Sequence, residues 1–403
     1  MAVRELFASY GTTLGCDPEL FVTRQAGRVR KRIAAVGSER IVPKAGLRYP
    51  GSFMDNVTRD GVQVELHAGS ASLYCRQHLA SILGLSFQKL DNAVATARTT
   101  RKDPSLKITF APMVTLTRAD MATLSPEARE LSCKPSLNAY GREHITRDGS
   151  IYPIRTASGH LHLGNVLFSG KRIDPNDGVK ICDLLIGIPC VLVDQDPSQK
   201  IRRETYGRAG EYRLPTHGLE YRVPSNFWLK DYKLQSMVFG LAKLAMRVCE
   251  GYVSGSGLKW AKDALIKKVD FAKVEQAINE NDFDMALRIY TESIRPFADQ
   301  IKGYVGFGNG LMDQFEFFVD RIHEKGLRHW FDVKDEAILD RWTNLNYTIG
   351  WECFLTGKVL QQMNAAKFTG IIIDPPKLAA ARSKSERRMT VPTTTEPSLR
   401  IAA

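Results

Sequence analysis

Ionisable residues recur in pairs, two positions apart, in five short segments of the sequence. The pairs are Asp17 and Glu19, Glu65 and His67, His160 and His162, Glu211 and Arg213, and Glu220 and Arg222. Residues i and i+2 of a β-strand point to the same face of a sheet, so each pair predicts two ionisable side chains on one side. The intervening Leu161, Tyr212 and Tyr221 are then expected on the opposite face, towards the core. Pro18 makes the first pair less regular, which leaves Glu19 as its firmer member.

Several carboxylates and imidazoles on one sheet face need a counter-charge, because like charges close together disfavour ionisation. A divalent cation supplies it, and oxygen ligands with one or two histidines suit Mg²⁺ or Mn²⁺. The arginines of the pairs suit phosphate, and Arg202, Arg203 and Arg208 add basic residues shortly before Glu220. Carboxylates, metal and arginine on one face are typical of a phosphoryl-transfer site.

Each pair alone has an ordinary explanation, since exposed strand faces often carry alternating polar residues. Glu65 and His67 fit a plain surface, with His67 a bystander, and Glu211 and Arg213 fit a cross-strand ion pair. The two histidines at 160 and 162 could be structural hydrogen-bonding residues. Gly159 and Gly164 flank them, however, and indicate a close approach of the backbone. The joint occurrence of the pairs favours a functional site.

The elements that must position these pairs are mainly strands in the first half of the chain. Alternating apolar runs, bounded by turn residues, predict strands at Leu20–Val22, Val62–Leu66, Lys107–Pro112, Leu161–Leu167 and Gly187–Val193. One helix is predicted from Ser72 to Arg98, where apolar residues recur at helical spacing. This mixture predicts an α+β fold with a largely antiparallel sheet.

After Pro224 the pattern becomes helical. Helices are predicted at Asn226–Gly251, Val269–Asn279, Asp284–Ile301, Leu311–Glu324 and Lys334–Asn344, and Asp282 or Asp284 is expected to cap the third of them. The glycine-rich stretches Gly251–Gly257 and Gly303–Gly310 lack the GxxxxGK[ST] pattern and are interpreted as helix–helix turns. We expect an α+β catalytic domain (1–225), a helical region packed on it (226–374) and a disordered basic tail (375–403).

The formal net charge of +12 suggests a nucleic-acid partner at first. Most of the excess lies in Arg24–Arg48 and in residues 377–403, so the rest of the chain is nearly balanced, which argues against nucleic acid as the main partner. No apolar run approaches the roughly 20 residues of a membrane helix, and Arg4 and Glu5 do not suit a signal peptide. The seven cysteines form no CxxC pair, so we expect a reducing, cytoplasmic compartment.

Five motifs, in chain order, carry a family resemblance. GCDPELF, DGVQVEL, SGHLHLG, YGRAGEYR and LEYRVPSNFW resemble the phage carboxylate–amine ligase family (type 2), a relative of glutamate–cysteine ligase and glutamine synthetase. The resemblance spans roughly residues 14–228. It implies an antiparallel sheet that forms a half-open funnel, with ATP and Mg²⁺ (or Mn²⁺) as cofactors, and a location in the host cytoplasm if the protein is phage-encoded. It also implies the ATP-dependent joining of a small-molecule or peptide carboxylate to an amine.

The resemblance also implies roles for individual residues. The implied metal ligands are Asp17, Glu19, Asp60, Glu65, His160, His162 and Glu220. The implied catalytic arginines are Arg203, Arg213 and Arg222, and those on ATP phosphate are Arg203, Arg208 and Arg222. The relatives often have Glu where this chain has Asp17 and Asn where it has His162, which leaves open whether His162 binds metal or orients substrate. The sequence does not decide between Glu211 and Glu220 as a ligand, although the LEYRVP context favours Glu220.

Two other functions remain open from sequence. His160 and His162 have the spacing of a zinc site on a strand, which would suit a metal-dependent hydrolase with a third histidine or cysteine ligand. The basic segments would suit a non-catalytic nucleic-acid-binding or virion-associated protein on the same fold. The helical region is compatible with an oligomer. The two substrates of a ligase cannot be read from these motifs.

Overall fold

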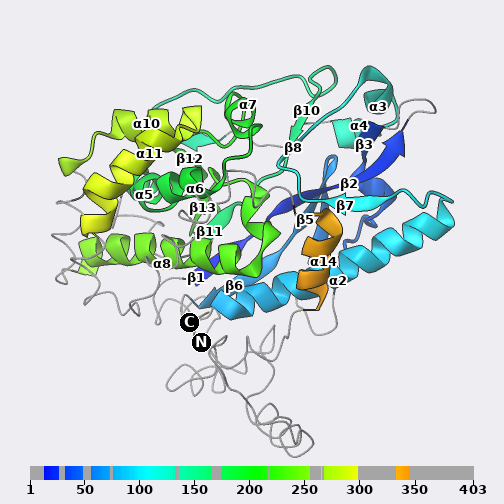
Figure 1. The fold of residues 1–403 in the computed structure, drawn as a ribbon, viewed down its shortest axis with the longest axis horizontal. Helices are drawn as coiled ribbons and strands as arrows, with labels where there is room; N and C mark the ends of the chain where they lie inside the picture. The colour runs from blue at the N-terminus through cyan, green and yellow to red at the C-terminus, as the bar shows by residue number, and fades with distance from the viewer. Residues whose placement is uncertain are drawn as a thin grey trace, which may run out of the picture.

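The computed structural model describes residues 13–344 except 27–31, 49–55, 73–75, 130, 132–135, 165–173, 217, 255–264, 266 and 298–332. It confirms the predicted α+β fold, with antiparallel pairing between the strands (Figure 1). The helix predicted at 311–324, the glycine-rich segment 303–310 and the tail 375–403 lie outside the described residues.

The larger sheet has six strands. Their order is β6 (Ala68–Ser72), β1 (Thr13–Cys16), β11 (Leu161–Gly164), β13 (Gly218–Tyr221), β12 (Glu211–Arg213) and β9 (Leu137–Asn138). A second sheet has the order β3 (Arg32–Val36), β2 (Glu19–Ala26), β5 (Gln63–Leu66) and β4 (Val57–Asp60), and β7 (Lys107–Thr109) also pairs with β2. β8 (Met113–Thr115) pairs with β10 (Ile154–Thr156). Because only Asp17 and Pro18 separate β1 from β2, the two larger sheets adjoin at this point of the chain.

Two long helices, α2 (Arg76–Thr100) and α8 (Tyr232–Ser254), lie along these sheets (Figure 1). α8 contacts β1 and β11, and α2 contacts β6, β5 and β4. A continuous buried helical run packs against them. It comprises α5 (Pro175–Cys182), the π-helix η3 (Asp183–Gly187) and α6 (Ile188–Val193). Leu161, Leu163 and Tyr221 point into this layer and are fully buried. A buried leucine of this kind contributes about 1.5–3 kcal/mol to folding, so the alternation fixes which sheet face is apolar.

The described residues form further helices. They are η1 (Ser38–Arg40), α3 (Arg118–Ala122), α4 (Pro126–Arg129), α7 (Gln199–Arg203), η4 (Asn226–Lys230), α10 (Phe271–Glu280), α11 (Phe283–Ile289), η5 (Tyr290–Ile294) and α14 (Asp335–Thr343). Asp282 caps α11 by accepting a hydrogen bond from the Met285 amide, which settles the choice between Asp282 and Asp284. α14 packs on α2, and the Trp342 indole donates to the Leu229 carbonyl at 2.6 Å.

Three sequence-based assignments were wrong. Residues 187–193 were predicted as a strand but belong to the buried helical run, where every side chain is covered and no period can distinguish helix from strand. The single helix predicted at 226–251 is interrupted, because η4 ends at Asp231, which has an extended backbone, before α8 begins. Ser72 ends strand β6 rather than beginning a helix. None of the described helices combines the length and apolar character that a membrane crossing requires.

Candidate active site

Strand register places the predicted residues of β11, β12 and β13 on one face of the six-stranded sheet. Arg213 lies opposite Glu220, Glu220 opposite His162, and His162 opposite Gly15. The next row, which includes Tyr212, Tyr221 and Leu161, faces the helices, and the Tyr221 hydroxyl donates to Asp183 of η3 at 2.7 Å. The predicted alternation is therefore confirmed for β11, β12 and β13. Gly15, opposite His162 in this polar row, contributes no side chain to it.

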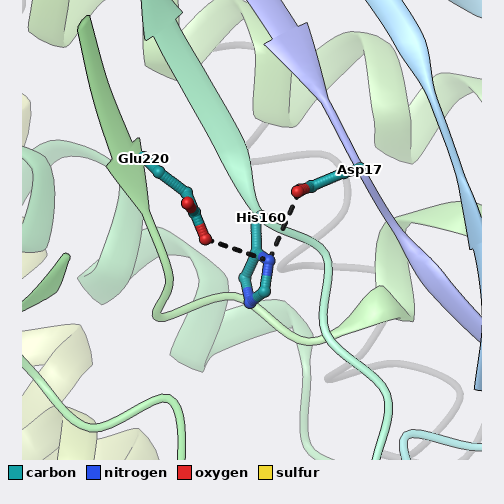
Figure 2. Close-up of side chains that lie close together, drawn as sticks. All are labelled: Asp17, His160 and Glu220. Carbon is teal, nitrogen blue, oxygen red and sulfur yellow. Dashed lines mark ion pairs between the residues drawn. The ribbon is translucent and has the colours of Figure 1, made fainter. Parts of the chain in front are cut away.

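Asp17, His160 and Glu220 converge on this polar face (Figure 2). Asp17 follows β1, His160 precedes β11 and Glu220 lies in β13, so three distant parts of the sequence supply the group. His160 Nδ1 lies 3.4 Å from Asp17 Oδ1 and 3.5 Å from Glu220 Oε1. All three residues are at most 6% exposed. His162 Nε2 adds a contact of 2.9 Å to Asp17 Oδ2.

The donor atoms of this cluster suit a cation. One ligand atom from each of Asp17, His160 and Glu220 lies within 4.8 Å of the other two. Within the described part of the chain, the buried atoms Asp17 Oδ1 and His160 Nδ1 have no hydrogen-bond partner. Buried polar atoms normally find a partner, so the convergence of these two atoms is consistent with a cation-binding site. Two carboxylates and one imidazole are a ligand set that Mg²⁺ or Mn²⁺ accepts.

A second acidic group lies on the adjoining sheet. Glu19 of β2 is in register with Glu65 of β5, and Asp60 ends the neighbouring strand β4. Burial raises the pKa of Glu19 well above its usual value, and the charges of Asp60 and Glu65 raise it further. Burial likewise raises the pKa of Glu65 to about 7. Carboxyls held in this way gain stability from a nearby cation, because it favours their charged form.

His67 does more than the sequence suggested. Its Nε2 lies 3.3 Å from Glu65 Oε2 and 2.8 Å from the Thr58 hydroxyl. Burial opposes the charged form of His67, but the hydrogen bond to Glu65 raises its pKa overall. Its i+2 spacing from Glu65 was the only signal for this contact in the sequence.

The basic side of the polar face is built around Glu220. Arg213 Nη2 donates to Glu220 Oε1 at 2.6 Å, and Arg222 Nε lies 3.1 Å from the same oxygen. Burial opposes ionisation of Glu220, but His160 and Arg213 lower its pKa below the usual value. Burial also opposes ionisation of Asp17, yet His162 and His160 hold its pKa well below the usual range. Carboxylates, imidazoles and guanidinium groups thus meet on one buried surface.

Glu211 occupies a different place from Glu220. Its Oε2 accepts a hydrogen bond from the Gly207 amide at 2.8 Å. Burial raises the pKa of Glu211, while the Gly207 amide, Arg222, Arg202 and the half-buried Arg208 oppose that rise. The structure therefore brings Glu220, and not Glu211, into the group with Asp17 and His160.

A comparison with known protein families matches one of the two parts of the chain that build this site. Residues 147–256 match the family model described as phage phiEco32-like COOH·NH2 ligase, type 2. The resemblance to the phage carboxylate–amine ligases is thereby confirmed for this segment. The family's name describes a ligase that joins a carboxylate to an amine. No curated protein matches the sequence.

The matched segment, residues 147–256, contains His160, His162 and Glu220 together with the candidate arginines, whereas Asp17 and the acidic group on β2, β4 and β5 lie before it. The predicted ligands thus come from both inside and outside the matched residues. The two parts are held together by the pairing of β1 with β11, in which Gly15 lies opposite His162.

Two arginines of the matched segment already donate hydrogen bonds to neighbouring protein groups. Arg203, predicted to act on phosphate, donates to the Ile278 carbonyl and, at 2.9 Å, to Asn281 Oδ1, both next to or within α10. Ile278 also lies beside the Tyr221 hydroxyl near Gly187, which places this contact on the helix-covered side of the sheet. Arg202 donates to the carbonyls of Val223 and Pro224 at 3.0 and 3.1 Å.

Two glycines in this region lie where neighbouring groups leave no room for a side chain. A Cβ on Gly159 would collide with the Trp228 indole and the Ser225 carbonyl, which confirms the close backbone approach predicted there. Gly207 has φ +70° and faces the Arg202 guanidinium, so a side chain would be both strained and obstructed. Sequence reasoning missed Tyr206, which begins the YGRAGEYR motif and contacts both His160 and Arg222.

Proposed function

We propose that the protein is an ATP-dependent carboxylate–amine ligase that activates its acid as an acyl phosphate and requires Mg²⁺, with Mn²⁺ as an alternative. The observation that carries the proposal is the convergence of Asp17, His160 and Glu220, with Arg213 and Arg222 on the same Glu220 oxygen. The family name supports the overall reaction. The polar sheet face would line the half-open funnel that such a reaction needs.

The chemistry explains why both metal and arginine are required. A carboxylate does not react with an amine at neutral pH, because oxide would have to leave. In the first step a carboxylate oxygen attacks the γ-phosphorus of ATP, and the bond to the ADP oxygen breaks. The amine then attacks the acyl carbon, the carbon–oxygen bond to phosphate breaks, and a proton is lost from nitrogen. The products are an amide, ADP and phosphate.

Each part of the polar face has a role in this scheme. Asp17, His160 and Glu220 would hold one cation, with His162 fixing Asp17 from its second oxygen. Glu19, Asp60 and Glu65 would hold a second one across the adjoining sheet. A cation held by these residues would supply positive charge that offsets the charge of the ATP phosphates.

The arginines would act on the phosphates. Arg222 and Arg213 already project from the sheet face at Glu220, where they would stabilise charge on the transferring phosphoryl group. Arg208 would bind ATP phosphate from the neighbouring loop. Arg203 is left out, because its guanidinium binds next to α10. A hydrolase built on His160 and His162 would leave Arg213 and Arg222 without a role.

The test is to measure ADP release with Mg²⁺ over a panel of carboxylates, with hydroxylamine as the amine. We expect ADP and a hydroxamate with at least one acid, because hydroxylamine traps an acyl phosphate. The same experiment would identify the acid. No ADP and no hydroxamate with any acid would contradict the proposal. Hydrolysis of a substrate without ATP would favour the hydrolase instead.

A further inference from the structure

Tyr206 lies next to His160 of the candidate metal cluster. It follows α7, is 5% exposed, and its hydroxyl lies 2.9 Å from His160 Nε2. The other ring nitrogen of His160 faces Asp17 and Glu220. Tyr206 therefore contacts the side of the imidazole that points away from the cluster.

The same hydroxyl also binds Arg222. Arg222 Nη2 donates to Tyr206 Oη, and the guanidinium carbon lies 4.9 Å from the centre of the Tyr206 ring. Arg222 Nε in turn lies 3.1 Å from Glu220 Oε1. One phenol thus bridges an imidazole of the cluster and a guanidinium on the phosphate side.

These contacts bear on which ring nitrogen of His160 carries the proton. A guanidinium only donates hydrogen bonds, so Tyr206 Oη is the acceptor towards Arg222. Tyr206 Oη can either accept from His160 Nε2–H or donate its own proton to Nε2, and only the first arrangement leaves the Nδ1 lone pair for a cation beside Asp17 and Glu220. A metal-bound histidine commonly donates its other N–H to such a partner, which fixes both tautomer and ring orientation.

We propose that Tyr206 is a positioning residue that holds His160 in the metal-binding tautomer and keeps Arg222 in register with it. The inference rests on the metal cluster of the proposed function and adds to it a residue that does not itself touch the cation. It accounts for the first residue of the YGRAGEYR motif. It also couples metal binding to the placement of an arginine for phosphate.

The variant Tyr206→Phe tests this, because it removes the hydroxyl and keeps the ring that packs on Arg222. Tyr212→Phe is the matched control. Tyr212 is equally exposed and its hydroxyl also makes one bond at 2.9 Å, to Asn176, but it lies on the opposite sheet face. Mn²⁺ affinity is measured by calorimetry on the full chain. We expect Tyr206→Phe to bind Mn²⁺ about 10- to 100-fold more weakly, with Tyr212→Phe unchanged.

The outcomes separate this inference from the proposed function. If the wild-type protein binds no Mn²⁺, the metal cluster itself is refuted and the role of Tyr206 with it. If wild type and Tyr206→Phe bind Mn²⁺ equally well, the cluster stands and the positioning role is refuted. A merely structural tyrosine would lower the melting temperature without changing Mn²⁺ affinity.

A measurement on the wild-type chain decides the matter if Tyr206→Phe does not fold. Long-range proton–nitrogen NMR correlation with Mg²⁺ present reports which ring nitrogen of His160 carries the proton, with the signal assigned by its loss in His160→Gln. We expect the proton on Nε2. A proton on Nδ1 would overturn the proposal.

Discussion

Glu220 is the residue at which the acidic and basic halves of the polar face meet. One of its oxygens is shared by Arg213 and Arg222 and lies 3.5 Å from His160 Nδ1. A carboxylate in this position can bind either a guanidinium group or a cation without a change in the backbone of its strand. The role of Glu220 therefore depends on its negative charge as well as on its shape.

The variant Glu220→Gln separates charge from shape. We expect Mn²⁺ affinity and ATP turnover to fall by at least about 10- to 100-fold. Loss of a residue that only supports a metal ligand typically has an effect of this size, and here a direct ligand is removed. Glu211→Gln is the control, since its amide oxygen can still accept the Gly207 amide, and it should keep Mn²⁺ affinity. Full Mn²⁺ binding by Glu220→Gln would refute the assignment of Glu220.

Arginine substitutions distinguish the phosphate side from the helix side. Arg222→Lys is expected to lower kcat by about 10³-fold, because lysine cannot reproduce the planar fork that stabilises a moving phosphoryl group. Arg203→Lys should lower the melting temperature through its lost contacts with Ile278 and Asn281 but keep kcat. Steady-state ADP release and thermal unfolding of both variants provide the test. The reverse pattern would restore the catalytic role that sequence alone gave to Arg203.

At the scale of elements, strand alternation was the part that the sequence could predict. The pleat of β11, β12 and β13 places Glu211, Arg213, Glu220 and His162 on one face of the sheet, as the i, i+2 spacing within each pair predicts. Asp17 and His160 were also predicted as ligands, but their convergence with Glu220 needed the structure, because each lies just outside a strand, where the pleat no longer fixes a direction. Arg203 sat near the motif in sequence, but its helix α7 turns the side chain towards α10.

The buried helical run shows why one element was mispredicted. From Cys182 to Val193 the residues are 0–1% exposed, so the apolar pattern has neither a helical nor an alternating period. Asp183 is the one acidic residue between Cys182 and Val193. Its Oδ1 accepts a hydrogen bond from Tyr221, and burial raises its pKa to about 7.

Asp183→Asn tests the pH dependence that follows from this burial. The folded carboxyl holds its proton more tightly than the unfolded one, so its contribution to stability is fully present below about pH 4 and is lost as the pH rises towards 7. An amide stays neutral and can still accept from Tyr221. We expect the variant to gain about 2–4 kcal/mol at pH 8 and less at pH 5 in urea unfolding. An equal difference at both values would contradict the pKa of Asp183.

At the scale of the whole molecule, the cluster joins parts of the chain that lie far apart in the sequence. Asp17, His160 and Glu220 are brought together only when β1, β11 and β13 pair. An unfolded chain has no such site, so cation binding adds its free energy to folding.

Cation binding should therefore stabilise the whole protein. At a free Mn²⁺ concentration about 100 times Kd, the free energy of unfolding should rise by about 2.7 kcal/mol. Thermal unfolding with and without Mn²⁺ measures this, and Glu220→Gln should lose most of the rise. An equal rise in both proteins would place the bound ion elsewhere.

The most direct test of the central claim follows the carboxylate oxygen. The acid found active in the hydroxamate panel is prepared with ¹⁸O in its carboxyl group and turned over with ATP, Mg²⁺ and hydroxylamine. Activation as an acyl phosphate transfers one labelled oxygen from the acid to phosphate, so we expect one ¹⁸O in the phosphate released for each hydroxamate formed. Unlabelled phosphate, or label found in AMP, would contradict the account.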